Sequence, residues 1–376
     1  MFRGNVTPNT HERPNPTSGS GTAPVVSWLR PGDWDEWDRF VSGQPHGVIF
    51  HLSAWRRVIE RSFRHMRGRV VVIRDPQSGA ILGGLPVYDV RSWLLGNRLV
   101  SIPFASLCDP LVAGVAEWKQ IWAAVASERR AGGKTPFECR TWRRSGVLPN
   151  GGQCPTETAL HHWLDLSPGL DAVYSKFSRT AIRRMISKSK ARGTLVRRAD
   201  CEADVATYYS LLVQSRRRIG LPTIPYVFFR SCWEYLPEEN RSFVIAIRND
   251  RPVAAIFSVC YGANFLMEQS GETDETCGTG AVQQLIWEEI QKAHSLGCTL
   301  VSYGRTAVEN TSLASYKLHW GTTQEVLTTY WPGSPPVQRN AVAGASPSRR
   351  MIGWLSNHSP LAVYHAMSRF CYKHWG

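Results

Sequence analysis

Two parts of the chain repeat one order of apolar and polar segments. Residues 69–88 contain an apolar run, a polar turn and a second apolar run, and residues 243–261 contain the same order. Turn residues between two runs rich in branched apolar side chains predict a β-hairpin. In both parts the first run ends in the pair Ile-Arg, at residues 73–74 and at residues 247–248. The two hairpins are therefore expected to be copies of one element.

The similarity extends beyond the hairpins. A helix precedes each hairpin. Each hairpin is followed by a short strand, then a helix with apolar positions at spacings of three and four, then a glycine and a further strand. The strands after the hairpins cover residues 99–104 and 265–270, the helices 117–131 and 280–296, and the last strands 136–142 and 298–304. Repetition at an offset of about 170 residues predicts an internal duplication. We expect an α/β fold with two tandem domains, each a mixed, mostly antiparallel central sheet flanked by helices.

Changes in composition indicate where these domains begin and end. Residues 1–24 are polar and rich in Pro, Asn, Thr and Gly, which predicts a disordered leader, and residues 333–350 have the composition of a linker. The first domain is then expected over residues 25–160 and the second over residues 161–332. Residues 351–376 predict a basic, amphipathic C-terminal helix, which either docks on the body of the protein or contacts a membrane surface.

Composition narrows the class of protein. Of the 376 residues, 43% are hydrophobic and 20% are charged, which excludes a wholly disordered chain. Lys and Arg number 44 against 30 Asp and Glu, and a net charge of +14 favours a polyanionic partner. The nine cysteines include no Cys-x-x-Cys pair, which argues against a zinc ribbon. Without a signal peptide or an apolar span of membrane length, we expect a cytoplasmic protein, at the inner face of the membrane if the C-terminal helix binds lipid.

The most basic segment covers residues 176–198, where nine Lys or Arg occur without one Asp or Glu. A solvated helix face is one interpretation. Repulsion among nine like charges favours the other, which is a polyanionic partner. Arg183, Arg184 and Lys188 are the candidate contacts on this helix.

A second group of candidates follows the last predicted strand of the second domain. Arg305 lies just beyond a strand end, where open α/β sheets bind ligands, and a guanidinium suits phosphate or carboxylate. Lys317 is expected either to face the same opening beside Tyr316 or to lie in solvent on a helix that buries the Tyr316 ring. Tyr303 donates a phenolic proton or is simply buried, and Trp320 either contacts substrate or joins the core.

The order of elements resembles the GNAT acyltransferase fold, and two copies in one chain resemble the FemAB/FemX family. The resemblance covers about residues 45–330. Three motifs carry it: residues 303–321 resemble a family loop followed by Leu-x-x-aromatic-Lys, residues 215–222 resemble a family Arg-x-Gly motif, and the basic helix at residues 177–193 resembles the helix that enters the second domain. The chain departs from the family at Ser302, where Asp is usual, and it has no heptad repeat for a coiled-coil arm.

Proteins of this family transfer an aminoacyl group from aminoacyl-tRNA to a peptidoglycan precursor, and related proteins occur in exopolysaccharide clusters. The resemblance implies that Lys317 and Tyr316 hold the tRNA acceptor end. It also implies that Arg218, with Arg217 beside it, binds the phosphates of an amine acceptor that is phosphorylated or nucleotide-linked. Acyl transfer needs a polarised carbonyl and a neutral amine held close together. No general base is identified, no cofactor is expected, and substrate-assisted proton transfer is a plausible route.

Two other functions stay open. Residues 275–280 lie where CoA-dependent GNAT enzymes carry a pyrophosphate loop at a helix start, and Gly278 and Gly280 match its glycines, but Glu275 would repel phosphate. An acyl-CoA-dependent N-acyltransferase acting on a sugar amine or polysaccharide is therefore the first alternative. The loss of Asp at Ser302 supports the second, a non-catalytic binding protein. The pair at residues 161–162 is the only adjacent His pair and has no further ligands, so we expect no metal site.

Overall fold

The computed structural model describes residues 24–105, 108–130, 133–134, 136–142, 153–332 and 347–374. Almost all of the predicted leader and most of the predicted linker lie outside these residues. The described chain forms a sheet of twelve strands in the order β1-β2-β3-β4-β7-β14-β8-β13-β12-β11-β10-β9. A separate pair of short strands, β5 (Arg129–Arg130) and β6 (Gly133–Lys134), lies outside this sheet.

The first half of the chain supplies one end of the sheet and three of its helices. Its strands are β1 (Val25–Trp28), β2 (Met66–Arg74), β3 (Ile81–Val90), β4 (Arg98–Val100), β7 (Phe137–Thr141) and β8 (Gln153–Asp165). Its α-helices are α1 (Trp34–Ser42), α2 (Ser53–Ser62) and α3 (Val115–Ala126).

The second half repeats this order. Its strands are β9 (Leu195–Arg198), β10 (Arg241–Arg248), β11 (Arg251–Tyr261), β12 (Asn264–Glu272), β13 (Leu300–Thr306) and β14 (Thr323–Pro332). Its helices are α6 (Glu202–Arg218), α7 (Tyr226–Tyr235), α8 (Ala281–Ser295) and α9 (Thr311–Leu318). A helical segment joins the halves, made of α4 (Leu170–Ser175), a π-helical stretch (Arg179–Arg183) and α5 (Arg184–Ala191). The chain continues into α10 (Pro347–His358) and α11 (Leu361–His374).

The predicted fold class is confirmed. Both predicted hairpins are present, as β2–β3 and β10–β11, and both continue into a third strand, a helix and a fourth strand. The fourth strand pairs with the third in parallel in each half, as β4–β7 and β12–β13. Some predicted boundaries are too long: the strand expected over residues 99–104 ends at Val100, and the helix expected to reach residue 131 ends at Ala126.

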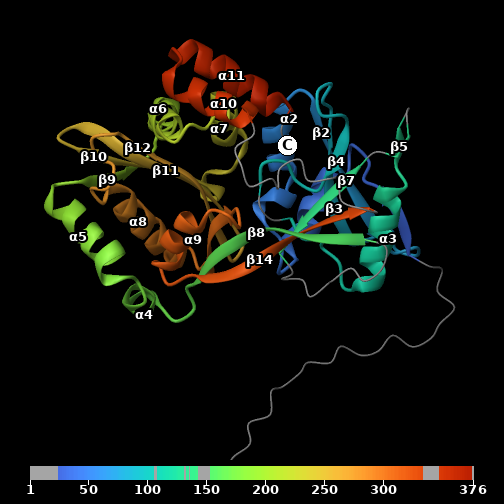
Figure 1. Ribbon diagram of the computed structural model, residues 1–376. Coiled ribbons are helices and arrows are strands. Elements are labelled where there is room, and N and C mark those ends of the chain that lie inside the picture. The colour runs from blue at the N-terminus through green and yellow to red at the C-terminus, as the bar shows by residue number, and fades with distance from the viewer. Residues whose placement is uncertain are drawn as a thin grey trace, which may run out of the picture.

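The two halves exchange their last strands. β14, from the second half, lies between β7 and β8 and pairs with both in antiparallel register. β8, from the first half, lies between β14 and β13. Figure 1 shows β8 and β14 side by side where the halves meet. Each half therefore completes the sheet of the other, and β8 brings first-half residues up to the strands of the second half.

Helices cover both faces of the second half of the sheet. In Figure 1, α6 and α7 lie on one face with α10 and α11 outside them, and α8 and α9 lie on the other. α8 buries the apolar stripe predicted from its sequence, including Leu285, Ile286 and Ile290. The halves also pack directly, because the Trp55 ring of α2 meets the Phe228 ring of α7 at a centroid distance of 5.8 Å. Burial of large aromatic side chains at this contact holds the halves together.

Candidate functional site

The strands β12 and β13 part in the middle of the sheet. They pair in parallel only at their first residues, and the last pair is Leu266 with Ser302, although both strands continue further. Each strand also has a bulge here: Glu268 is the extra residue of β12 opposite β11, and β13 loses register with β8 between Ser302 and Arg305. Bulges bend strands and expose backbone groups, and they are common beside active sites.

Lys317 points from α9 to the edge of β13 at this position. Its side-chain nitrogen Nζ donates hydrogen bonds to the carbonyl oxygens of Gly304 and Arg305, both at 3.2 Å. The residue is only 6% exposed. Burial lowers the pKa of the Lys317 ammonium to about 8, and the opposite charge of Glu268 works against that shift. A cation is therefore held where the two strands part.

Glu268, at the bulge of β12, is the acid whose charge acts on this cation. Burial raises the pKa of the Glu268 carboxyl to about 7, and the charge of Lys317 opposes the rise. A carboxyl that titrates near neutrality can accept a proton from an amine at physiological pH. The sequence analysis missed Glu268, because it lies within a predicted strand. A single acid in the otherwise apolar run at residues 265–268 was the available signal.

β8 contributes two histidines beneath the same region. His161 is fully buried, and its Nε2 lies 2.8 Å from the Ser302 hydroxyl oxygen, which also accepts a hydrogen bond from the Gly304 amide. The His162 Nε2 lies 3.1 Å from the Gln324 side-chain oxygen. Burial, together with the charge of Lys317, lowers the pKa of His162. Ser302 therefore has a structural partner in His161.

Three of the predicted residues lie around Lys317. Tyr316 is half-buried, and burial raises the pKa of its phenol to about 12, so the phenol stays protonated. Tyr303 is buried, its ring lies 5.9 Å from the Trp320 ring, and its hydroxyl has no hydrogen-bond partner among the described residues. Arg305 is exposed on β13, although neighbouring atoms partly desolvate its guanidinium and, with the charge of Arg140, lower the pKa of that group. Trp320 itself is fully buried in the core beneath α9.

Arg218 ends α6 and reaches the far end of β12. Its guanidinium pairs with Asp274 at 2.7 Å and with Glu272 at 3.6 Å. Glu272 is four residues beyond Glu268, which corresponds to about 13 Å along a strand. Arg217 points elsewhere and donates to the carbonyl oxygens of Ser356 (3.2 Å) and Ser359 (2.6 Å) at the end of α10. The two neighbouring arginines therefore have different surroundings, one beside β12 and one beneath the C-terminal helices.

The basic segment forms a groove on the surface of the second half. A groove of about 630 Å³ is lined by Arg179, Thr180, Arg183, Arg184 and Ser187. Lys188 is exposed on the following helix, α5. The segment reaches α9, because the Ser178 amide donates to the His319 carbonyl oxygen at 2.8 Å. Arg183, Arg184 and Lys188 thus lie on a helical segment whose first turn is hydrogen-bonded to His319, two residues beyond Lys317.

The glycine turn before α8 is tightly packed. Gly278 and Gly280 both have positive φ, 71° and 97°, and Gly280 caps the start of α8. A Cβ on Gly280 would lie 2.1 Å from the Met185 carbonyl oxygen of α5, whereas a Cβ on Gly278 would meet no atom within 4 Å. Packing of α5 therefore explains Gly280 without any ligand.

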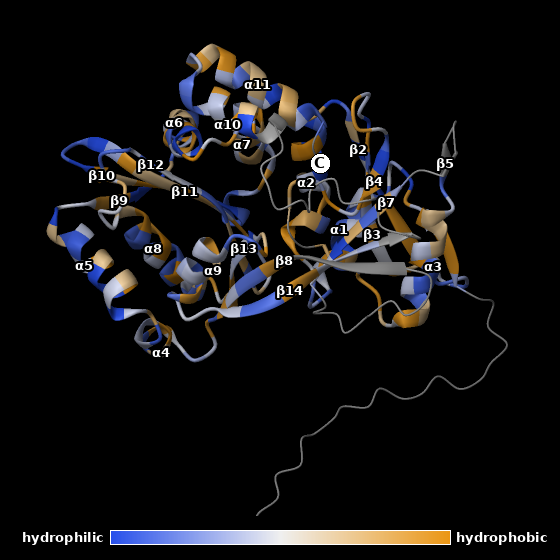
Figure 2. Ribbon diagram, viewed as in Figure 1, coloured by the Kyte–Doolittle hydropathy of each residue, from blue (hydrophilic) through white to orange (hydrophobic). Residues whose placement is uncertain are grey.

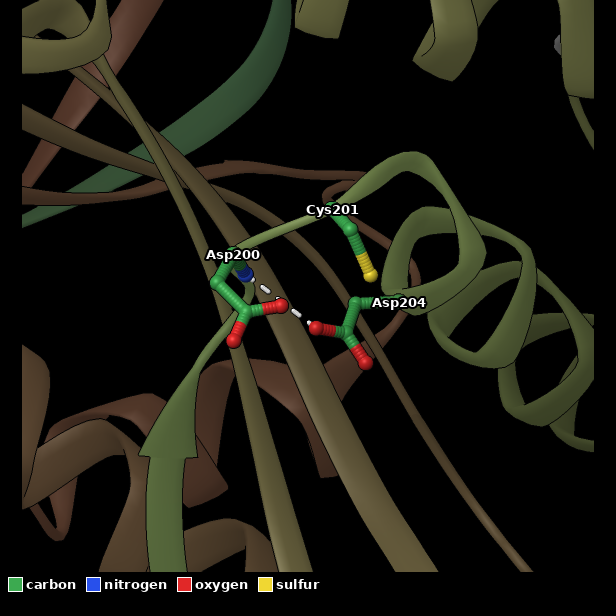
Figure 3. Close-up of side chains that lie close together, drawn as sticks. All are labelled: Asp200, Cys201 and Asp204. Atoms are coloured by element: carbon green, nitrogen blue, oxygen red, sulfur yellow. Dashed lines mark hydrogen bonds between the residues drawn. The ribbon is translucent and has the colours of Figure 1, made fainter.

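A group of potential metal ligands lies at the start of α6 (Figure 3). Asp200, Cys201 and Asp204 offer ligand atoms within 4.8 Å of one another. The Asp204 carboxylate is already held by the Arg197 guanidinium and by the Asp200 amide at 3.1 Å. The hydrogen bond from Arg197 keeps the pKa of Asp204 far below its usual range. This arrangement stabilises the first turn of α6, where the helix dipole favours acids.

Comparisons with known proteins agree with this geometry. Residues 176–318 match the family described as acetyltransferase (GNAT) domain, a range that includes both Glu268 and Lys317. A crystal structure of FemX is similar with a TM-score of 0.66 and 12% sequence identity, over 81% of this chain and 96% of that chain. A tandem GNAT protein from the clavulanic acid biosynthesis pathway is 13% identical over 83% of this chain and all of that chain, with a TM-score of 0.47. A comparison with curated proteins finds no match.

Proposed function

We propose that the chain, whose residues 176–318 match a GNAT acetyltransferase domain and whose fold resembles that of FemX, transfers an aminoacyl group from aminoacyl-tRNA to an amine. The acceptor in this proposal is a phosphorylated or nucleotide-linked precursor of the cell envelope, such as a peptidoglycan precursor. Both substrates are cytoplasmic, and the expected location of the reaction is therefore the cytoplasm. The observation that carries the proposal is the position of Lys317 at the edge of β13 where β12 and β13 part, with Glu268 at the bulge of β12.

The proposed reaction forms one bond and breaks another. The acceptor must first lose a proton, because only a neutral amine has the lone pair that attacks a carbonyl carbon. Glu268 takes that proton. The amine nitrogen then bonds to the ester carbonyl carbon of the donor and the carbon–oxygen bond to the tRNA ribose breaks. The second proton that the nitrogen loses as the amide forms passes to the departing ribose oxygen. Lys317 stabilises negative charge on the donor, either at a phosphate or at the developing oxyanion.

Three further features support large anionic substrates. Tyr316 lies next to Lys317 and offers a ring for a terminal base. The groove with three arginines at residues 179, 183 and 184 is joined to α9 through Ser178 and His319. Arg218 pairs with Glu272, which is four residues beyond Glu268 and so about 13 Å away along β12, and this suits an elongated acceptor whose phosphate is distant from its amine. For acyl-CoA, by contrast, the glycine turn would have to receive a pyrophosphate while α5 packs against Gly280.

The test is a donor exchange with purified full-length protein. Radiolabelled aminoacyl-tRNA and acetyl-CoA are each offered with nucleotide-linked amine acceptors, and amide product is measured with and without prior ribonuclease treatment of the donor. The proposal requires ribonuclease-sensitive product that disappears in Lys317→Ala. Product from acetyl-CoA alone would establish the CoA-dependent N-acyltransferase acting on a sugar amine or polysaccharide. Binding of tRNA without product from either donor would establish a non-catalytic protein.

A further inference from the structure

Four large apolar side chains are exposed together where the first half of the chain meets α11. The loop between β3 and β4 carries Trp93, Leu94 and Leu95, which are 75%, 52% and 57% exposed, and Phe370 of α11 is 49% exposed. The Trp93 and Phe370 rings lie 6.5 Å apart between centroids. We call these four residues the apolar tip. A contiguous exposed apolar group of this kind marks an interaction site more often than chance exposure.

The backbone beneath the apolar tip is firmly held. The Ser92 hydroxyl lies 2.8 Å from the His374 Nδ1 and also accepts a hydrogen bond from the Leu95 amide at 2.9 Å. The Arg98 guanidinium donates to the His374 carbonyl oxygen at 3.2 Å. The loop is thus tied at both ends to the last turn of α11. The hydrogen bonds hold the backbone of this loop in place, so the apolar tip is presented on an ordered surface.

The exposed charged side chains named beside the apolar tip are all cations. Arg91, Arg369 and Lys373 are exposed beside it, and Arg91 shares one ion pair with the buried Asp89. The loop sequence at residues 91–98 contains no acid, and the sequence contains no Asp or Glu after Glu325. A protein partner with an apolar surface would not require this excess of cations. An anionic lipid surface would, because each Lys or Arg near it adds electrostatic attraction.

The helices that carry this surface have the pattern of an interfacial element. Figure 2 shows hydrophobic and hydrophilic residues alternating along α10 and α11. Further exposed apolar side chains on the two helices are Met351, Trp354, Leu361 and Val363. Within the described residues, no helix is long and apolar enough to cross a membrane. An aromatic and aliphatic tip surrounded by cations is typical of proteins that lie on a bilayer.

We propose that the apolar tip, together with α11, docks on an anionic phospholipid bilayer. Trp93 and Phe370 enter the interface between headgroups and acyl chains, Leu94 and Leu95 reach the acyl chains, and Arg369 and Lys373 contact lipid phosphates. The bound protein would then work at the membrane surface, close to acceptors attached to lipid. This surface lies outside the residues proposed for catalysis, so its failure would leave the acyl transfer untouched.

The experiment is co-sedimentation of the full chain with sucrose-loaded vesicles. Vesicles of phosphatidylcholine alone are compared with vesicles that also contain phosphatidylglycerol. The test variant is Leu94→Asp/Leu95→Asp, and the matched control is Leu195→Asp, which changes an exposed leucine on the edge strand β9. A third variant, Lys373→Glu, tests the charge. Melting temperatures of all variants are measured to exclude unfolding.

We expect the wild type and Leu195→Asp to bind phosphatidylglycerol vesicles, and less so at high salt. Leu94→Asp/Leu95→Asp should bind at least about tenfold more weakly, because each buried leucine contributes to the free energy of binding. Lys373→Glu should weaken binding to the anionic vesicles only. The proposal is overturned if the wild type does not bind, if the leucine variant binds like the wild type, or if that variant instead turns a dimer into a monomer, which would make the tip a self-association surface.

Discussion

The Lys317 Nζ donates a hydrogen bond of 3.2 Å to the Gly304 carbonyl oxygen. This contact fixes a cation of α9 at the point where β13 separates from β12. Gly304 adopts a φ of 68°, a left-handed conformation that glycine tolerates, and this turns its carbonyl toward α9. The charge is therefore positioned by backbone groups. An acidic side chain bonded to Lys317 would have cancelled part of that charge.

Replacing Lys317 by Met should test the role of this charge. Lys317→Met keeps the length of the side chain and removes its charge, and we expect the rate of acyl transfer to fall by about 10²-fold or more. The two carbonyl oxygens lose their donor, so the free energy of unfolding should also fall by about 1–3 kcal/mol. Steady-state kinetics and thermal unfolding measure the two effects. Lys119→Met, on the exposed side of α3, is the control. Full activity in Lys317→Met would remove the residue from the mechanism.

Glu268 should control the acid side of the pH profile. The reaction needs Glu268 ionised, with a pKa of about 7, and Lys317 protonated, with a pKa of about 8. We therefore expect a narrow bell-shaped profile with its maximum between these values, which belong to the interacting pair rather than to either residue. Glu268→Gln should lower kcat by about 10²–10⁴-fold and remove the acid limb. Glu288→Gln, an acid on α8, should leave the profile unchanged; an intact acid limb in Glu268→Gln would refute the assignment.

The same carboxyl should affect stability in a pH-dependent way. Its pKa is raised from 4.5 to about 7 in the folded protein, so the folded state binds this proton more tightly than the unfolded state does. The contribution of this proton to the free energy of unfolding is fully present below pH 4.5 and is lost as the pH rises to about 7. Glu268→Gln should thus stabilise the protein at pH 8 by about 1–3 kcal/mol, and hardly at pH 4.5. Denaturant unfolding at both pH values measures this difference; equal effects at both would contradict it.

The sequence predicted the hairpins and the duplication because these depend on local patterns. The run around Ile73 and its copy around Ile247 each have neighbours along the chain as partners. The exchange of β8 and β14 was not predicted, because nothing in the sequence of either strand says that Val326 will face Leu160 of the other half. Pairing between distant strands depends on the assembled sheet.

The candidate site was predicted in part for a related reason. The motif at residues 303–321 led to Lys317 and Tyr316, and the structure brings both to the place where the strands part. Glu268 was missed because its role depends on a bulge, which inserts one residue opposite Phe257 and Ser258. A bulge changes the direction of a side chain without a distinct change in composition. The contacts of Arg217 were equally hidden, because they require the position of α10.

Arg218 and Arg217 should differ in their effects when mutated. If Arg218 binds the acceptor phosphate, Arg218→Ala should raise the KM for the acceptor by about 10–100-fold with a smaller change in kcat. Arg217→Ala should leave KM unchanged and lower the melting temperature, because its hydrogen bonds to Ser356 and Ser359 hold the end of α10. Acceptor titrations and thermal unfolding of both variants are the measurements. An unchanged KM in Arg218→Ala would show that the residue serves only its ion pairs with Glu272 and Asp274.

Gly280 and Gly278 provide a matched pair for the turn before α8. Gly280→Ala should lower the free energy of unfolding by about 2–5 kcal/mol, because the new Cβ would overlap the Met185 carbonyl oxygen and α5 would have to move. Gly278→Ala meets only open space, so its cost is the positive φ alone, about 1–2 kcal/mol. Denaturant unfolding of both variants separates a packing role from a ligand role. If the two cost the same, the contact with α5 is not what requires glycine at residue 280.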